Sequence, residues 1–323
     1  MMEAIGGYFE LADCVEEQSV HQEGVLLNTG RNALEYILRI IGAVKCVYLP
    51  CYTCNAVLEP LKKLNIPWIF YRINSSFEID DKIRLQDGEY IIANNYFGIK
   101  DAYIGMLAEQ DGEHLIVDCA QALFATPIPG IKAFYSTRKF VGVADGGIAY
   151  LGDSYEKSFE LYDVECTEDH DNHLVKRKQF GAEAGFADFQ ENEKKLKGQP
   201  IRWMSDKTKQ ILTHIDYEKV VARRRENFKY LHEALGEMNG LDLPESDSFA
   251  CPMVYPFFTN DKTIKQRLIN ERIYVATYWP NVFEWCKPED WEYQVAEKAV
   301  FLPIDQRYDV NDMRRIITTI NNA

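Results

Sequence analysis

The sequence predicts an α/β protein in which a large domain with a largely parallel sheet is followed by a smaller C-terminal α/β domain. From about residue 25 to 151, apolar runs of strand length alternate with helix-like stretches. The runs are continuously apolar, which is typical of strands that helices cover on both faces. The chain has 323 residues, too many for one core of usual size. We therefore expect a large domain over residues 1–215 and a small one over 216–323.

The large domain has helix-like segments between its predicted strands. In residues 32–41, apolar side chains recur at the i, i+3, i+4, i+7 spacing of one helix face. In sheets of this kind a ligand binds beyond the carboxyl ends of the strands, so we expect the chemistry there. The predicted strands are 44–49, 67–73, 90–94, 114–117, 133–136 and 148–151.

The second half of the chain begins with a change of character. Residues 153–200 are polar, densely charged and weakly periodic, which predicts solvated helices and a long loop. Loops this long inside compact proteins are more often functional or partner-facing than idle. Residues 205–235 are predicted to be helical. The small domain is expected to contain strands at 253–258 and 273–276 and a closing helix at 311–320.

Charge and composition limit the possible partners. Asp and Glu number 50 against 36 Lys and Arg, which gives a net charge of −14. A field of this sign disfavours nucleic acid and anionic membrane surfaces. No run reaches the roughly 18 apolar residues of a membrane span. The N-terminal sequence has no basic n-region or apolar h-region, so we expect a cytoplasmic protein whose eight cysteines are reduced.

The motif LNTGRNAL places Gly30 just before the predicted helix at 32–41. Unpaired backbone donors at a helix N-terminus form a ready anion site, which would suit a cofactor phosphate. An ordinary helix cap has the same sequence, so this motif alone leaves both interpretations open.

The motif HLIVDCAQA places Asp118 at the carboxyl edge of the sheet, with Gln121 three residues further on. A buried carboxylate is costly unless a cation or a donor pairs with it. The protonated ring nitrogen of pyridoxal phosphate (PLP) would be such a partner, because the pairing keeps the ring an effective electron sink. A helix-capping aspartate is the alternative.

The motif AFYSTRKFVGVADGGIAYL places Lys139 in a loop between two predicted strands. A partly desolvated lysine has a lowered amine pKa, so it can form a Schiff base and later carry a proton. A lone lysine would be interpreted as solvated. Lys139, however, has Asp118 upstream, and Ser136 and Arg138 adjoin it.

The motif VYLPCYTCNAV forms a strand-to-helix turn where a residue that stacks on a cofactor ring is expected. Tyr52 is the aromatic candidate inside this turn. The alternatives are that Tyr52 only packs in the core, or that Cys54 points inward in its place.

These motifs, in this order, resemble the DegT/DnrJ/StrS-type aminotransferases, the family that makes amino sugars on nucleotide carriers. The other matching stretches are GGYFEL, MSDKTKQIL, VARRRENF, VATYWP and FLPIDQRYDVNDMRRI. The resemblance implies a PLP-dependent transferase of fold type I with a mostly parallel seven-stranded sheet. It assigns the Schiff-base lysine to Lys139, the ring-nitrogen partner to Asp118 and the ring-hydroxyl contact to Gln121. The implied cofactor-binding residues are Gly30, Arg31, Asn32, Tyr52, Cys54, Asp118, Gln121, Ser136 and Lys139.

The implied activity is transfer of an amino group from an amino acid, glutamate by resemblance, to a keto-sugar on a nucleotide carrier. Such enzymes serve surface-polysaccharide or amino-sugar biosynthesis, and the implied assembly is a homodimer. Lys139 distinguishes the chain from a dehydratase branch of the family that has histidine there. Cys54 replaces the family's usual aromatic residue, and QPIRWMSD lacks an asparagine that the family supplies to the neighbouring subunit. Two alternatives therefore stay open: a non-catalytic or regulatory PLP-binding protein, and a PLP enzyme with a non-sugar substrate.

Four further patterns have competing interpretations. Cys46, Cys51 and Cys54, with Cys119, have the spacing of an iron–sulfur protein, but Cys46 lies inside a predicted strand. A redox pair at Cys51 and Cys54 has no companion motif. His170 and His173 lie in a hydrophilic stretch, so we predict no metal site. The basic run KRK at 176–178, with Arg202, is expected either near a partner subunit's pocket or on a solvated face.

Overall fold

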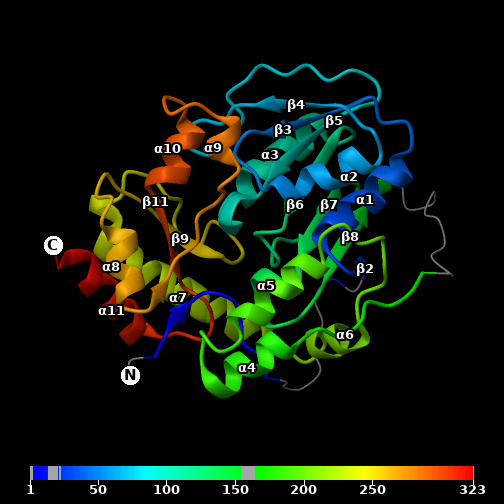
Figure 1. Ribbon diagram of the computed structural model, residues 1–323. Coiled ribbons are helices and arrows are strands. Elements are labelled where there is room, and N and C mark those ends of the chain that lie inside the picture. Colours follow the sequence, from blue (N-terminus) through cyan, green and yellow to red (C-terminus); the bar gives the residue numbers. More distant parts are fainter. Residues whose placement is uncertain (1–2, 14–20, 22, 154–163, 323) are drawn as a thin grey trace.

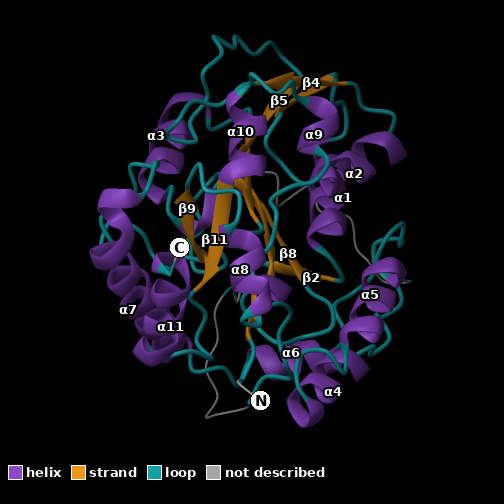
Figure 2. Ribbon diagram, turned by 60° about the vertical axis from the view of Figure 1, so that its left-hand side comes forward, coloured by secondary structure: helices purple, strands orange, loops and turns teal. Residues whose placement is uncertain are grey.

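A seven-stranded sheet forms the centre of the computed structural model, which describes residues 3–13, 21, 23–153 and 164–322 (Figures 1 and 2). The strand order is β2-β8-β7-β6-β5-β3-β4. The strands β4, β3, β5, β6 and β7 run parallel, whereas β8 is antiparallel to both β7 and β2. The sheet strands are β2 (Val25–Leu27), β3 (Cys46–Pro50), β4 (Trp68–Tyr71), β5 (Glu89–Asn94), β6 (Leu115–Cys119), β7 (Lys132–Ser136) and β8 (Gly147–Leu151).

Helices cover the faces of this sheet, as the continuously apolar strands require. All five residues of β6 are buried, so neither face of this strand meets water. The predicted fold class, a mostly parallel sheet in an α/β protein, is confirmed. The helices are α1 (Gly30–Ile41), α2 (Leu58–Lys63), α3 (Asp101–Asp111), α4 (Asn172–Phe180), α5 (Phe186–Lys195), α6 (Asp206–Leu212), α7 (Tyr217–Leu235), α8 (Ile264–Asn270), α9 (Val282–Trp285), α10 (Trp291–Lys298) and α11 (Val310–Asn321).

Helix α1 shows how the local sequence fixes an element at the site. The side chain of Thr29 caps the helix by accepting a hydrogen bond from the backbone N–H of Asn32 at 3.1 Å. Gly42 ends the helix with a φ of 82°, a conformation that glycine adopts without strain. The apolar face packs against β7 and β8, and this packing directs the N-terminus of the helix at the sheet edge.

The C-terminal part of the chain has its own strands and helices. The antiparallel strands β9 (Val254–Phe258) and β11 (Ala299–Pro303) pack with α7 and α11, which lie side by side in Figure 2. The N-terminal strand β1 (Ile5–Gly6) pairs with β10 (Ile273–Tyr274), so the first residues join this part. The predicted domain boundary after residue 215 falls between α6 and α7 and stays a prediction.

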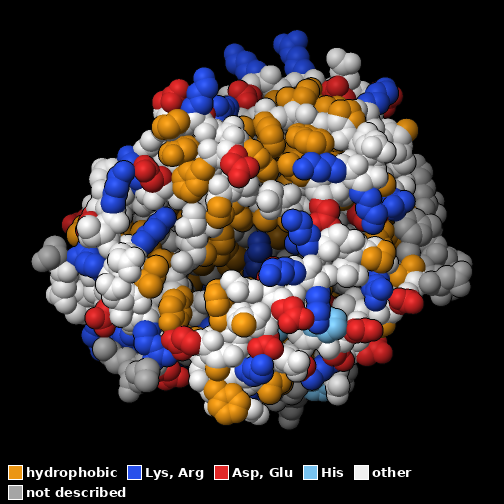
Figure 3. All heavy atoms as spheres, viewed as in Figure 1, with side chains coloured by type: hydrophobic (Ala, Val, Ile, Leu, Met, Phe, Trp, Pro, Cys, Tyr) orange, Lys and Arg blue, Asp and Glu red, His pale blue; other side chains and the backbone are white. Residues whose placement is uncertain are grey.

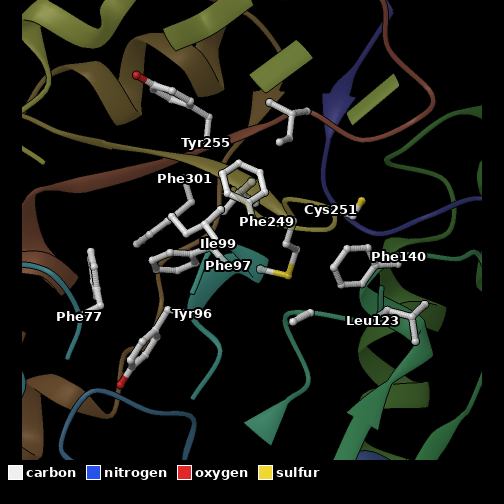
Figure 4. Close-up of a cluster of buried hydrophobic side chains, with 14 of the residues drawn as sticks. Phe77, Tyr96, Phe97, Ile99, Leu123, Phe140, Phe249, Cys251, Tyr255 and Phe301 are labelled. Atoms are coloured by element: carbon white, nitrogen blue, oxygen red, sulfur yellow. The ribbon is translucent and has the colours of Figure 1, made fainter. Parts of the chain in front are cut away.

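An aromatic cluster joins the two parts (Figure 4). Phe97, which follows β5, lies 5.0 Å between ring centroids from Phe301 of β11. Phe140 belongs to the same cluster and follows Lys139 directly, so the Lys139 turn is anchored in the core. Buried rings of this size stabilise the contact through apolar area and ring–ring geometry.

The second half of the chain differs in one respect from the sequence prediction. The segment 205–235 forms two helices, α6 and α7, because the Asp216 side chain accepts a hydrogen bond from the N–H of Lys219 and starts a new helix. Of the charged stretch 153–200, positions 154–163 lie outside the described residues, and α4 and α5 follow. Within the described ranges, no helix combines the length and apolar character needed to cross a membrane.

Candidate active site

A cavity of about 170 Å³ lies where the carboxyl ends of β6 and β7 meet the N-terminus of α1. This is the position that a largely parallel sheet predicts for a ligand. Figure 3 shows the face of the molecule that Figure 1 presents. This face is hollowed near its centre, and Lys and Arg side chains lie in and beside the hollow. Seven of the predicted cofactor-binding residues line the cavity: Gly30, Arg31, Cys54, Asp118, Gln121, Ser136 and Lys139.

Lys139 ends a short 3-10 turn, Thr137–Lys139, that follows β7. The first residue of this turn fixes it to the following loop, because buried Thr137 donates a hydrogen bond through Oγ1 to the carbonyl oxygen of Asp145 at 3.1 Å. The Lys139 side chain faces the cavity, and its amine makes no hydrogen bond or ion pair with any described residue. An amine without a fixed partner is free to react with a bound molecule.

Asp118 is the fourth residue of β6 and is buried. Its Oδ1 accepts one hydrogen bond, from the N–H of Ala120 at 2.8 Å. Burial raises the pKa of the Asp118 carboxyl, and the positive charge of Lys139 and the Ala120 N–H partly oppose this rise. The carboxylate is therefore buried with unused acceptor capacity, so a cation bound in the cavity would stabilise it.

Gln121 and Asn94 have unused polar atoms in the cavity wall. Gln121 Oε1 accepts a hydrogen bond from the N–H of Phe97 at 3.2 Å, whereas its Nε2 has no partner in the described part of the chain. Asn94 Nδ2 donates to Thr53 Oγ1 at 3.0 Å, and its Oδ1 has no partner there either. Buried polar atoms are normally hydrogen-bonded, so these two atoms indicate a polar ligand.

Glycines in the VADGG turn let β8 approach the start of α1. A Cβ atom at Gly147 would lie 2.1 Å from the carbonyl oxygen of Thr29, so no larger residue fits without a shift. Gly146 has a φ of 126°, which strains any other residue. The preceding Asp145 accepts hydrogen bonds from the N–H and Oγ of Ser205, at 2.8 and 2.7 Å. These hydrogen bonds between Asp145 and Ser205 join the VADGG motif to the MSD motif next to the cavity.

Two residues of the predicted phosphate-binding turn make contacts within the chain. Arg31 Nη1 donates to Glu59 Oε2 and to the carbonyl oxygen of Leu196, each at 3.3 Å. Asn32 is buried, and its Nδ2 donates to the carbonyl oxygen of Gln199 at 3.0 Å. Asn32 does not line the cavity, so its structural contribution is to hold the start of α1.

The turn at residues 51–57 does not bring Tyr52 to the cavity. The Tyr52 side chain is fully buried and meets Trp279 edge-on, with 5.1 Å between ring centroids. Trp279 and Cys54 line the cavity in its place. Both alternatives for this turn therefore apply: Tyr52 packs in the core, and Cys54 lies at the cavity.

Sequence reasoning missed Glu193, which lines the cavity, and named Arg138 only as a neighbour of Lys139. Arg138 Nη2 donates to Glu193 Oε1, which ties α5 to the Lys139 turn. Burial acts to raise the pKa of the Glu193 carboxyl, but the charge and the hydrogen bond of Arg138, together with the charge of Arg31, outweigh it, and the pKa is lowered. The charged composition of 153–200 was the available signal, but it did not single out Glu193.

The basic run 176–178 makes contacts within the chain. Lys176 pairs with Asp188 at 2.7 Å and Lys178 with Asp13 at 2.5 Å. Arg177 is buried and lines a second cavity of this same chain. The expected clamp on a partner subunit's pocket therefore lacks a free charge at Lys176 and Lys178, and Arg177 lines a cavity of its own chain.

The described residues form neither a metal site nor a thiol pair between Cys51 and Cys54. In the described residues, no group of three or more His, Cys, Asp and Glu is placed to hold a metal ion. Cys46 is buried within β3. The Cys51 thiol is hydrogen-bonded to Cys286 and not to Cys54, so the C-x-x-C spacing does not form a thiol pair.

The sequence matches no protein-family model and no curated protein. Solved structures, in contrast, resemble the chain over more than nine-tenths of its length. The sugar aminotransferase CalS13 from Micromonospora echinospora has 15% identity and a TM-score of 0.62, covering 93% of this chain and 87% of that one. A DegT DnrJ EryC1 StrS aminotransferase from Brucella abortus has 16% identity and a TM-score of 0.62, with 92% and 84% covered. DesI, solved in the presence of its TDP-sugar product, has 17% identity and a TM-score of 0.65, with 92% and 79% covered. The chain therefore has the fold of these enzymes.

Proposed function

We propose that this protein is a PLP-dependent aminotransferase that belongs with the DegT/DnrJ/StrS-type enzymes. One observation carries the proposal: the unpaired amine of Lys139 and the buried carboxylate of Asp118 line a single cavity at the carboxyl edge of the sheet. The fold shared with sugar aminotransferases supports it. A fold alone does not establish an activity, so the residues of the cavity carry more weight.

The cavity residues fit this cofactor. Lys139 would hold it covalently, and the Asp118 carboxylate would lie against the ring nitrogen, where a positive charge offsets the cost of burial. Gln121 Nε2, which has no partner in the described chain, would donate to the ring hydroxyl. The N-terminus of α1 at Gly30, with Ser136, would receive the phosphate. When bound, PLP supplies the electron sink for amino transfer.

Lys139, Asp118 and the pair of Arg138 with Glu193 have different roles in the proposed reaction. The Lys139 amine takes up and returns the proton at the reacting carbon, because it lies at the end of a rigid turn beside the cavity. The charge of Asp118 would keep the ring nitrogen of the cofactor protonated. The ion pair between Arg138 and Glu193 ties α5 to the turn that carries Lys139 and so helps to hold that turn in place.

Substitution of Lys139 tests the proposal directly. Lys139→Ala should abolish covalent attachment of PLP, measured as the visible absorbance of the protein and as a mass shift after borohydride trapping. Amino transfer should be lost with it. Lys176→Ala is the matched control, since Lys176 pairs with Asp188 on the surface. Covalent cofactor or full activity in Lys139→Ala would refute the assignment.

We further propose glutamate as the first donor to assay and a nucleotide-linked keto-sugar as the acceptor, with a homodimer as the working assembly and the cytoplasm as its location. DesI, which shares the fold, was solved with a TDP-sugar product, and this supports the acceptor class. The test is the visible spectrum of the PLP-loaded protein during addition of an amino acid. A spectrum that responds to no amino acid would favour a non-catalytic PLP-binding protein.

A further inference from the structure

The backbone next to Lys139 is held by the C-terminal part of the chain. The carbonyl oxygen of Phe140 accepts a hydrogen bond from Gln306 Nε2 at 2.7 Å, although the two residues lie 166 positions apart. Gln306 follows β11, whereas Lys139 and Phe140 follow β7. The Lys139 amine makes no hydrogen bond or ion pair with any described residue, so the turn that carries it determines where the amine lies. Contacts that fix this turn therefore also position the amine.

Arg224 fixes the side chain of Gln306. It is fully buried in α7, and its Nε donates to Gln306 Oε1 at 3.0 Å. A glutamine amide both accepts and donates, so the hydrogen bond from Arg224 directs the NH2 group of Gln306 at Phe140. Arg224 Nη1 donates to the carbonyl oxygens of Met253 at 3.0 Å and Pro252 at 3.3 Å, which anchors the guanidinium in the C-terminal part. One chain of hydrogen bonds thus runs from Arg224 through Gln306 to Phe140.

Arg224 also covers the side chain of Phe140. Its guanidinium lies over the Phe140 ring, 4.6 Å from the ring centroid, and the ring is fully buried in the aromatic cluster of Figure 4. A cation over an aromatic face is attracted to the ring. Phe140 is therefore held at two points, the carbonyl oxygen by Gln306 and the ring by Arg224. Two contacts at one residue restrict both the translation and the rotation of the turn beside Lys139.

Hydrogen bonds within the turn show how its opening can be measured. The N–H groups of Phe140 and Val141 both donate to the carbonyl oxygen of Thr137, each at 3.0 Å. These hydrogen bonds close the turn around Lys139, and they break when the turn opens. The rate at which the two N–H groups exchange with solvent therefore reports how firmly the turn is held.

We propose that Gln306 is a positioning residue for Lys139. It transmits the fixed position of Arg224 to the carbonyl oxygen of Phe140, so that the C-terminal part of the chain sets the place of the Lys139 amine beside the cavity. This inference rests on the proposed function, because it concerns the amine that would carry the cofactor. Misplacement of a reacting group by about 1 Å slows a reaction by up to about a hundredfold, so a small movement of the turn has a large effect.

Two substitutions separate the two halves of the Gln306 contact. Gln306→Met removes both the acceptor and the donor at a half-buried position. Gln306→Glu keeps an acceptor for Arg224 but has no donor for Phe140 near pH 7. Burial lowers the pKa of the Arg224 guanidinium, so a carboxylate at position 306 should offset part of the cost of that buried charge. Gln306→Glu should therefore melt at a higher temperature than Gln306→Met.

Amide hydrogen exchange of the cofactor-free full chain is the first measurement. In both variants the N–H groups of Phe140 and Val141 should exchange about fivefold faster than in the parent, because neither variant can donate to the Phe140 carbonyl. Gln266→Glu is the matched control, since the Gln266 amide is bonded to Asn270 on the exposed surface of α8, and exchange of the turn should not change. Exchange in Gln306→Glu equal to that of the parent would overturn the inference, because the turn would then need no donor at position 306.

Attachment of PLP is the second measurement. The visible absorbance of the attached cofactor should appear about tenfold more slowly in both Gln306 variants than in the parent and in Gln266→Glu. Equal rates in all of these proteins would also overturn the inference. Failure of the proposed function looks different. PLP would then not attach to Lys139 even in the parent, whereas the faster exchange of the turn in the two Gln306 variants would remain.

Discussion

Two regions of the molecule border Lys139. One is the carboxyl edge of the sheet, and the other is a helical cover, which consists of α4, α5 and the loop between them. Different forces hold these two regions in place. Backbone hydrogen bonds and buried apolar strands fix the sheet edge that carries Asp118. Ion pairs and aromatic contacts, such as Glu183 with Arg272 and Tyr8 with Phe189, hold the cover. The edge therefore suits chemistry that needs fixed positions, whereas the cover suits the selection of a substrate. Three changes test this division, beginning with the largest effect.

Asp118→Asn should lower amino transfer by at least about a hundredfold, since an amide supplies no charge to keep a ring nitrogen protonated. The amide oxygen can still accept the hydrogen bond from Ala120, so the fold should persist. Burial raises the pKa of the Asp118 carboxyl, which means that its charge is costly in the cofactor-free protein. The melting temperature of the unloaded variant should therefore be unchanged or higher. Asp87→Asn is the control, since the Asp87 side chain is fully exposed. Turnover in Asp118→Asn equal to that of this control would remove Asp118 from the role.

The contrast between the sheet edge and the helical cover explains which site residues the sequence could predict. Asp118, Lys139 and Gly30 lie at strand or helix ends, and the order of apolar runs determines where those ends meet. Their gathering at one cavity follows from local patterns along the chain. The strand β2 was missed because its three residues form too short a run to give a periodic signal.

The helical cover could not be predicted in the same way. Glu193 is hydrogen-bonded to Arg138, which is 55 positions away in the sequence, and Arg177 to Gly6, which is 171 positions away. No local sequence pattern marks either pair. The side of the turn on which Tyr52 lies was also open, because that choice depends on Trp279, which is far away in sequence. Tertiary contacts of this kind decide which of several equivalent polar or aromatic residues faces a ligand.

Glu183→Gln tests the cover through acid stability. Hydrogen bonds from Arg272 and Tyr274, opposed only by slight burial, lower the pKa of the Glu183 carboxyl to about 2. A lowered folded-state pKa stabilises the protein above the usual carboxyl pKa, and this contribution is lost as the pH falls from about 4.5 to about 2. Because the Glu183 side chain is 53% exposed, the contribution should not exceed about 1 kcal/mol.

The measurement for Glu183 is the free energy of unfolding at pH 7 and pH 3, in the parent protein and in Glu183→Gln. The variant should lose less stability on acidification, because the titrating carboxyl is absent. Glu233→Gln is the control, since it removes one carboxylate from the exposed surface of α7, 3.9 Å from Lys229. The same acid sensitivity in Glu183→Gln and the parent would show that the ion pair does not hold the cover.

The smallest effect is expected for Tyr52→Phe, which tests whether this ring belongs to the core or to the site. Tyr52 is fully buried, and its hydroxyl has no hydrogen-bond partner among the described residues, so its removal should leave stability unchanged or raise it by up to about 1 kcal/mol. Tyr71→Phe is the matched control in the same core. The Tyr71 hydroxyl donates to the carbonyl oxygen of Ile92 at 2.8 Å, so that variant should lose about 1 kcal/mol. PLP affinity should be the same in Tyr52→Phe as in the parent, because Trp279 and Cys54, and not Tyr52, line the cavity. If Tyr52→Phe bound PLP more weakly and Tyr71→Phe did not, Tyr52 would belong to the cofactor site, and its assignment to the core would be wrong.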